Sequence, residues 1–415
     1  MKKVFLNGSS IKKHAVRDRS ANGRFAVTVK RPFNMTPFIL AVTAVAFALP
    51  LVVMLGIRTD TAIAEWWTRN IQAGWERAVG TLTSWLPFSV FEFFVTAGII
   101  AGVYLIVRLF VNLCAGRFRR VITGALAVSI GAVYILNVYV LSMGFGYYRT
   151  VMPIPQAGRD YDKARLTSVI EYFVDDYNAL ALAFERDDNG CAVCPYTFAE
   201  LSDLIADEYS RLDGTYFARY TPKAKPVVNS WLLSDMLITG ITFLPFGEAT
   251  VNTVAPPSEM TLTMAHELAH TKGVQREGDA NLLARYVLLN SDNDYLRYCG
   301  YYGAFYNLVS AVMLFDDRDE YRRLVNKLDP AIGAENNYAR VYWNSQPDIV
   351  GKIAQGFNDI YLKLSGALNG VGSYGDGNKS DVIISTDPDT GEEVKKIYYS
   401  QTQMLFFALY EQRTA

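Results

Sequence analysis

The sequence predicts a multi-pass membrane protein in which three N-terminal transmembrane helices precede a mainly α-helical α+β domain. Two observations predict this fold class. Three long apolar runs fall early in the chain, and amphipathic helical patterns follow them toward the C-terminus. The 415 residues leave ample chain for a domain with a sizeable core. The net charge of −1 provides no basic footprint for phosphates, so no nucleic-acid partner is expected.

The three apolar runs cover residues 37–57, 93–113 and 121–145. Each is about 20 residues long, the length that a helix needs to cross a hydrocarbon layer of ~30 Å. Arg108 lies near the end of the second run, where its side chain can reach the interface. Buried helices of a soluble protein are the alternative, but three runs rich in small residues favour membrane spans. The first run is too long, and begins too late, for a cleaved signal peptide.

The distribution of positive charge predicts the orientation of the spans. Residues 1–36 carry nine Lys and Arg against one acid, Asp18. The short loop between the second and third runs is also basic and contains Arg117, Arg119 and Arg120. By the positive-inside rule both segments are cytoplasmic, so residues 1–36 form a basic cytoplasmic tail. Three spans then place everything after about residue 147 outside a bacterial cell membrane.

The loop between the first two runs differs from the other flanks. It mixes charges of both signs and carries four tryptophans, Trp66, Trp67, Trp75 and Trp85. Tryptophan is enriched where membrane meets water. We therefore expect this loop to lie on the outer membrane surface as an amphipathic segment.

The external part begins with a linker, residues 147–159, in which two prolines favour an extended chain. Residues 160–415 form the predicted domain. Strands are expected within residues 226–251, where β-branched and aromatic residues alternate with turn residues. Residues 369–393 are rich in Gly, Ser, Asn and Asp and predict a loop. Apolar periodicity predicts helices over residues 166–177, 197–211, 298–314, 318–328 and 349–368, with two more beginning near Pro257 and Gly278.

The motif that indicates chemistry is His266-Glu267-Leu268-Ala269-His270. On a helix, side chains at i and i+4 project from one face, so both imidazoles can bind one metal ion. Glu267 can then take a proton from a water molecule at the metal. Prolines begin the helix and Ser258 can cap it. The only other histidine of the chain, His14, lies in the predicted cytoplasmic tail. An exposed helix face with an incidental glutamate is the alternative interpretation.

An acidic cluster follows this motif. Gly273 allows the helix to end, and Glu277 and Asp279 come shortly after it. Four-coordinate catalytic zinc needs a third protein ligand and leaves one position for water. Glu277 is the better candidate and Asp279 the second, although both could be solvated surface acids. The sequence therefore predicts one Zn²⁺ per chain.

Two resemblances sharpen this prediction. HExxH followed by Glu277-Gly-Asp-Ala-Asn281 is similar to the gluzincin metallopeptidases, whose corresponding block reads E-x-x-A-D or E-x-E-A-N. The resemblance implies a zincin-like domain in which Glu277 is the third ligand and Asn281 orients a metal-binding histidine. Over most of its length the chain also resembles a bacterial membrane family of unknown function, DUF3810. Asp279 stands where that family usually has Glu, which favours Glu277 as the ligand.

The blocks that carry the second resemblance are residues 240–252, 266–281 and 358–375. In zincin-type peptidases an edge strand before the HExxH helix pairs with the substrate backbone. Residues 240–252 are in the right place for it, with Glu248 and Asn252 near the cleft, although an ordinary core strand would look the same. The oxyanion needs a donor besides the metal, and no histidine remains to supply it. Tyr374 is our candidate.

The chain has four cysteines, Cys114, Cys191, Cys194 and Cys299. Cys191-Ala-Val-Cys194 resembles a redox or metal half-site, but no second pair completes it. Outside the cytoplasm we expect a disulfide instead, either within the pair or between one of its members and Cys299.

Together these features predict a membrane-anchored zinc metallopeptidase. It would hydrolyse peptide bonds of envelope or extracellular proteins with Glu267 as general base. Its expected partners are the lipid bilayer and a protein or peptide substrate. A catalytically inactive sensor or scaffold that binds metal or peptide is the alternative, although structural zinc needs no general base. A transporter-like or assembly role is disfavoured because the spans lack paired intramembrane acids or bases.

Overall fold

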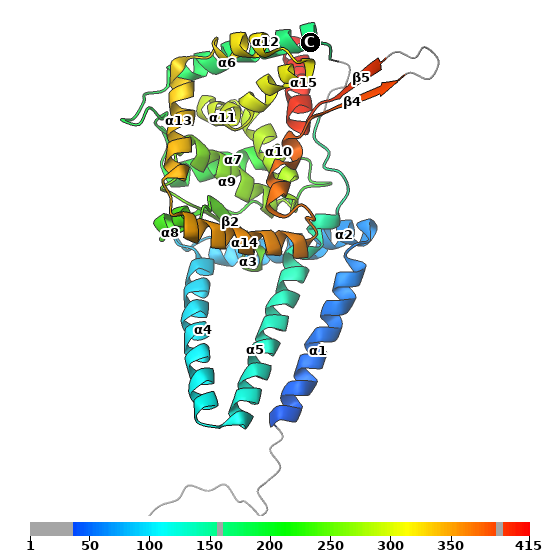
Figure 1. Cartoon of the computed structure of the whole chain (residues 1–415), viewed down its shortest axis with the longest axis vertical. Coiled ribbons are helices and arrows are strands. Elements are labelled where there is room, and N and C mark those ends of the chain that lie inside the picture. The colour runs from blue at the N-terminus through cyan, green and yellow to red at the C-terminus, as the bar shows by residue number, and fades with distance from the viewer. Residues whose placement is uncertain (1–35, 156–160, 387–392) are drawn as a thin grey trace, which may run out of the picture.

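The computed structural model describes residues 36–155, 161–386 and 393–415. Three long helices lie at one end of the molecule, and a mostly helical domain lies at the other (Figure 1). The predicted basic tail falls outside the described residues except for Thr36, and so do residues 156–160 of the predicted linker.

The long helices are α1 (Thr36–Ile57), α4 (Val90–Cys114) and α5 (Phe118–Tyr139). Within the described residues, three stretches are long and apolar enough to cross a membrane, namely 38–57, 90–114 and 118–148. They confirm the predicted spans to within a few residues, whereas the orientation of the spans stays a prediction. α5 packs against both α1 and α4. Asn137 Nδ2 of α5 donates a hydrogen bond to the carbonyl of Phe47 in α1 at 3.1 Å.

The segment between α1 and α4 is helical, as its amphipathic pattern predicts. α2 (Thr61–Trp67), a π-helical turn (Thr68–Gln72) and α3 (Ala73–Thr83) follow one another without a break and lie across the ends of the long helices (Figure 1). Asp60 caps this unit, because its side chain accepts a hydrogen bond from Ile63 N at 3.0 Å. At least half of the surface of four apolar side chains is exposed here, those of Trp66, Trp75, Leu82 and Trp85.

The domain contains ten α-helices among its described residues. They are α6 (Lys163–Ala183), α7 (Phe198–Ser210), α8 (Ser230–Asp235), α9 (Pro257–Thr271), α10 (Glu277–Leu289), α11 (Asp294–Ser310), α12 (Arg318–Val325), α13 (Pro330–Asn344), α14 (Asp348–Ser365) and α15 (Gln401–Thr414). Short 3-10 turns cover 146–148, 244–246 and 311–315. Three of these helices, α8, α13 and α15, were not predicted from the sequence, and α8 lies within residues 226–251, where only strands were expected. In α15 residues 402–409 are all buried, so no polar face reveals the helical period.

The main sheet has three short strands, β1 (Lys225–Pro226), β2 (Gly240–Phe243) and β3 (Glu248–Val251), in the order β1-β3-β2. β3 is the middle strand, parallel to β1 and antiparallel to β2. α9 packs against both β2 and β3. β2 is therefore an edge strand among the described residues, and it lies beside the HExxH helix.

The segment after α14 corrects the sequence analysis in part. Residues 369–393 are not one loop, because they contain a 3-10 helix (Gly370–Asn378) and the strand β4 (Asp381–Thr386). β4 pairs antiparallel with β5 (Glu393–Tyr398), and this hairpin projects from the side of the domain (Figure 1). The strand was missed because its three consecutive β-branched residues, 382–384, stand between polar residues in a segment that is otherwise rich in Gly, Ser, Asn and Asp.

The core of the domain surrounds α9, α10 and α11, which pack against one another. Buried tyrosines join the surrounding helices to these three. Tyr209 of α7 is completely buried, and its hydroxyl donates a hydrogen bond to the carbonyl of Ala265 at 2.6 Å. Ala265 immediately precedes His266, so this hydrogen bond helps to hold the start of the HExxH motif in its position in the core.

The predicted disulfide is wrong, because all four cysteines are free thiols. Cys299 is completely buried within α11, and Cys194 Sγ donates a hydrogen bond to the carbonyl of Tyr196 at 3.4 Å. Burial raises the pKa of Cys191 to about 12 and that of Cys299 still further. A thiol that stays protonated is a poor nucleophile and a poor metal ligand, so these cysteines behave as packing residues.

α14 has a buried face and an exposed apolar face, in addition to a charged face. Gly351, Ala354, Leu362 and Ser365 are buried, and Ser365 forms a hydrogen bond with Tyr139 at the end of α5. An apolar stripe points away from the buried face, with between 57% and 76% of each side chain exposed, and comprises Ile349, Ile353, Phe357, Ile360 and Leu364. The spacing of four, four, three and four residues places this stripe on one side of the helix. α14 lies at the level where the domain meets the long helices (Figure 1).

Candidate metal centre

The two histidines of the HExxH motif stand near the C-terminal end of α9. Pro257 is the first residue of this helix, where its missing N–H is not needed. Ser258 is not the cap that we predicted, because its hydroxyl donates a hydrogen bond to Glu335 instead. The helix ends at Thr271, and Gly273 follows with φ of +83°, a conformation that favours glycine.

A turn of five residues after α9 brings Glu277 back to the histidines. Glu277 is the first residue of α10 and is buried. Its Oε2 atom lies 3.2 Å from His266 Nε2 and 3.5 Å from His270 Nε2. The two Nε2 atoms are 3.1 Å apart. One atom from each of three side chains thus forms a nearly equilateral triangle.

This triangle has the size expected around a tetrahedral zinc ion. Ligand bonds of about 2.0–2.1 Å at tetrahedral angles place neighbouring ligand atoms about 3.3–3.4 Å apart. The three observed separations lie on both sides of that value. Within the part of the chain that the structure describes, these three residues form the one group of three or more His, Cys, Asp or Glu able to hold a metal ion.

Hydrogen bonds fix which nitrogen of each imidazole faces the triangle. His266 Nδ1 lies 2.9 Å from Asn281 Oδ1, and His270 Nδ1 lies 2.8 Å from the carbonyl of Val274. Asn281 Nδ2 donates to the carbonyl of Tyr374 at 2.9 Å, so its oxygen must face His266. Both Nδ1 atoms therefore carry protons, and both Nε2 atoms are available to a metal.

One oxygen atom of the Glu277 carboxylate also lacks a hydrogen-bond partner in the protein. This atom, Oε2, is buried and accepts no well-aligned hydrogen bond. A buried carboxylate oxygen without a partner is costly, and a cation at the centre of the triangle would remove that cost. Two imidazoles and one carboxylate are the ligand set of many catalytic zinc sites. The residues present therefore fit zinc.

The three ligand candidates shift one another's protonation. Burial alone would raise the pKa of Glu277, but the two imidazoles outweigh it and lower this pKa to about 2. Burial alone would lower the pKa of His270, but the Glu277 carboxylate outweighs it and raises this pKa to about 9. Without metal, a proton on His270 thus neutralises the charge of Glu277.

Glu267 lies beside the triangle and contacts the edge strand β2. Thr242 Oγ1 lies 2.7 Å from both Glu267 Oε2 and the Glu267 carbonyl oxygen. A Cβ atom on Gly240 would come within 2.7 Å of Glu267 Oε1, so only glycine allows this close approach. Burial raises the pKa of Glu267, and the neighbouring histidines partly oppose this rise. The sequence analysis missed Thr242, because only the tertiary structure brings β2 to α9.

Tyr374 lies at the rim of the same site. Its ring centre is 6.3 Å from that of His266, and its hydroxyl accepts a weak hydrogen bond from Asn358 of α14 at 3.4 Å. Burial raises the pKa of Tyr374, and the negative charge of Glu277 raises it further. The hydroxyl therefore keeps its proton and can donate it in a hydrogen bond. Asn358 was also missed, although it falls in one of the three blocks of the resemblance.

The other predicted residues lie elsewhere. Asp279 pairs with Arg276 at 2.7 Å and does not join the triangle. Glu248 is completely buried in the middle strand and pairs with Lys225 at 2.6 Å. Asn252 Nδ2 donates to Ser234 Oγ and to the carbonyl of Ile238. The polar groups of Glu248 and Asn252 are thus engaged within the protein, and β2 rather than β3 has the free edge.

Comparison with known proteins gives one match. The family described as "Protein of unknown function (DUF3810)" matches residues 67–377, which is well over half of the chain. The matched region runs from the end of α2 to the 3-10 helix after α14 and includes the whole candidate metal centre. No curated protein and no solved structure matches the chain significantly.

We expect the Glu277→Gln variant of the full-length protein to lose its zinc. Removing a direct ligand should weaken binding by more than the 10–100-fold typical of changes to residues that orient ligands. The measurement is zinc per chain by mass spectrometry after dialysis. Asp279→Asn is the matched control, because it removes the same charge two residues away and should leave about one zinc per chain. Zinc loss in the control with retention in Glu277→Gln would make Asp279 the ligand.

Zinc binding should also release a proton. The metal needs a neutral imidazole, whereas the raised pKa of about 9 keeps His270 protonated at pH 7 in the metal-free protein. The apparent affinity should therefore rise about tenfold per pH unit from pH 7 to about 9 and level off above it. Calorimetry in two buffers of different ionisation enthalpy counts the released proton. No release at pH 7 would contradict the assigned pKa shift.

Proposed function

The chain belongs to the DUF3810 family of proteins of unknown function, and we propose that it is a membrane-anchored zinc metallopeptidase. The observation that carries this proposal is the triangle of His266, His270 and Glu277 together with the buried Glu267 carboxylate, which interacts electrostatically with all three. A purely structural metal site would have no use for this second, uncoordinated acid.

Glu267 is the proposed general base. A zinc ion bound at the triangle would polarise the scissile carbonyl and make a water molecule more acidic. Glu267 would accept a proton from that water while the water oxygen bonds to the carbonyl carbon. The carbon–nitrogen bond would then break as Glu267 passes the proton to the leaving amine. The pKa of Glu267, raised by burial, is suited to this double role.

Thr242 is the proposed positioning residue for Glu267. The Thr242 hydroxyl lies 2.7 Å from two oxygens of Glu267, the backbone carbonyl oxygen and the carboxylate Oε2. A hydroxyl has one proton, so it cannot donate to both at once. When Glu267 is protonated, it can donate to Thr242 while Thr242 donates to the carbonyl. When Glu267 is ionised, the Thr242 hydroxyl can turn to its carboxylate. This contact would support both protonation states that the reaction requires.

The remaining parts of the site have matching roles in the proposal. The Tyr374 hydroxyl would donate a hydrogen bond to the oxyanion, as a protonated phenol at the rim of the site can do. The free edge of β2 would pair with the backbone of an extended substrate. The helix–sheet arrangement around α9 supports a zincin-like domain. The three apolar helices support anchoring in a membrane. The proposed location of the domain outside a bacterial cell, acting on envelope or extracellular proteins, follows from the positive charge of the predicted cytoplasmic segments.

We expect Glu267→Gln to keep zinc and lose activity. Glutamine has the same shape and can still accept from Thr242, so folding should be unaffected. Cleavage of an unfolded, fluorescently labelled protein by the full-length chain should fall about 10²–10⁴-fold. The wild type should also lose activity when zinc is chelated. Zinc in both proteins with cleavage in neither would favour a catalytically inactive metal- or peptide-binding sensor or scaffold.

Thr242→Val should lower kcat about tenfold or more and leave zinc content and KM nearly unchanged. The change removes a hydrogen bond to an ionisable group, worth about 1.5–3 kcal/mol, without removing bulk. Thr242→Ser restores the hydroxyl and should recover most of the activity. Equal activity in the valine variant and the wild type would exclude the positioning role.

A further inference from the structure

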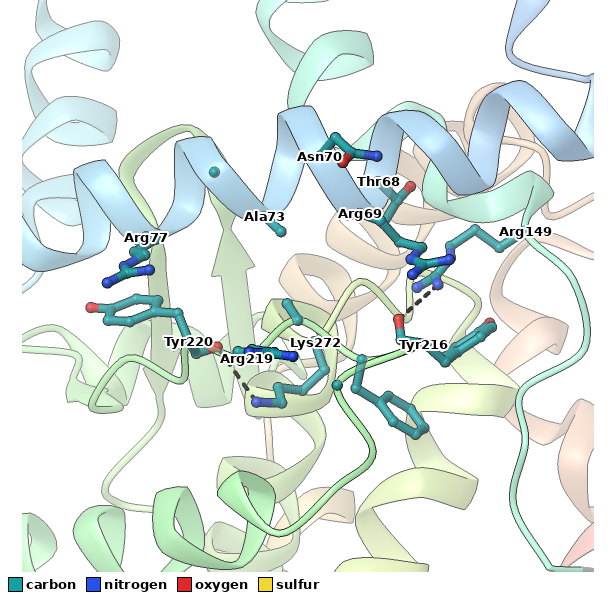
Figure 2. A pocket seen from close by; sticks show the side chains of 14 residues that line it. Thr68, Arg69, Asn70, Ala73, Arg77, Arg149, Tyr216, Arg219, Tyr220 and Lys272 are labelled. Atoms are coloured by element: carbon teal, nitrogen blue, oxygen red, sulfur yellow. Dashed lines mark hydrogen bonds between the residues drawn. The ribbon is translucent and has the colours of Figure 1, made fainter.

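A cavity of about 630 Å³ lies between the helix that joins the first two spans and the base of the domain. Figure 2 shows it below that helix, with Arg69 reaching down from the helix and Lys272 and Arg219 on the opposite wall. None of the residues proposed for catalysis or metal binding lines it. Lys272 follows the HExxH helix directly, so the cavity lies beyond the C-terminal end of α9.

The lining of this cavity is strongly basic. Five of its side chains are cationic, namely Arg69, Arg77, Arg149, Arg219 and Lys272, and no acid lines it. Two acids lie near the rim, and a third acid, the buried Glu76 of α3, acts on Lys272. Glu65 pairs with Arg149 at 2.9 Å, and the carboxylate of Asp213 accepts hydrogen bonds from Thr215 while Arg219 and Arg69 act on it at longer range. The cations therefore outnumber the acids around them.

Arg149 is a fixed part of the wall. Its Nη1 donates to the carbonyl of Gly273 at 3.0 Å, and its Nη2 donates to Glu65 and to the carbonyl of Tyr216. The guanidinium carbon lies 3.8 Å from the centre of the Tyr216 ring. Its hydrogen-bonding groups are largely occupied, so Arg149 gives the cavity its shape and contributes charge.

Lys272 is the unusual member of this group. Only 1% of its surface is exposed, and its ammonium donates to Thr221 Oγ1 at 2.8 Å and, weakly, to the carbonyl of Tyr220. Among the described residues, the buried Glu76 acts on this ammonium at longer range, but no carboxylate forms an ion pair with it. A buried ammonium without a directly paired counter-ion is costly, and an anion in the cavity would supply one. Arg69, Arg77 and Arg219 are exposed, and they also form no ion pair within the described residues.

We propose that this cavity binds a phosphate group. The planar guanidinium of arginine forms paired hydrogen bonds with phosphate oxygens, and lysine adds a point charge. The volume admits a phosphate together with the group that bears it. The same helix exposes Trp66 and Trp75, side chains typical of the membrane interface, which places the cavity near head-group depth. An anionic phospholipid is therefore the nearest source, and a soluble phosphate ester has the same chemistry.

The test is binding to the full-length protein in a neutral detergent after its lipids are removed. Calorimetry would compare a short-chain phosphatidylglycerol, the matching phosphatidylcholine and glycerol 3-phosphate. We expect saturable binding of the phosphatidylglycerol at one per chain. Binding of glycerol 3-phosphate with equal affinity would identify a soluble phosphate as the ligand, whereas much weaker binding would identify the lipid.

Variants assign the binding to this cavity. Arg69→Gln with Arg219→Gln should weaken it at least tenfold, and both side chains are exposed enough for the fold to tolerate the change. Lys272→Met removes the buried charge at similar volume and should also weaken binding. Arg318→Gln is the control, because it loses one exposed positive charge on α12, at the far end of the domain (Figure 1). Unchanged binding in the double variant, or no saturable binding of either phosphate compound, would overturn the proposal.

Discussion

The structure of the C-terminal domain depends on the turn that joins α9 to α10. Residues 272–276 reverse the chain so tightly that the first residue of α10 faces the last turn of α9. Each part of this turn is held by hydrogen bonds: Val274 accepts from His270, Gln275 donates to the His270 carbonyl, and Arg149 donates to the Gly273 carbonyl. Because the turn is fixed from three sides, the carboxylate of Glu277 meets the imidazoles without any adjustment of the helices.

Burying Glu277 and the two histidines together is unfavourable unless other interactions compensate for their lost hydration. Three ionisable side chains are buried within 3.5 Å of one another, and each would lose hydration on its own. Their mutual interactions compensate in the metal-free chain, and a divalent ion would do so more fully. Glu267 also interacts with this group electrostatically, but its carboxylate contacts Thr242 and is not one of the three candidate ligands. One helical turn thus provides two candidate ligands and, next to them, the proposed base that hydrolysis needs.

The sequence alone identifies the part of the site that local geometry determines. His266, His270 and Glu277 lie within two helices and one short turn, so helical spacing and ligand chemistry are enough to bring them together. Thr242 and Asn358 come from β2 and α14, and no pattern near the motif points to them. Glu248 was misinterpreted for a related reason: an acid in a short strand looks the same whether it faces a cleft or a buried lysine. The helix α15 was missed because burial on all sides hides its period.

Glu248 instead joins the domain to the membrane helices. Its carboxylate accepts hydrogen bonds from Lys225, from the hydroxyl of Ser89 and from the first backbone amides of α4. These amides have no partner within the helix, so a buried carboxylate at this end satisfies them and the helix dipole together. β3, which carries Glu248, pairs with β2, which carries Thr242. A short chain of direct contacts therefore runs from the start of a membrane span to the proposed base. The second span and the domain are thus in direct contact, and the family match covers the span and most of the domain.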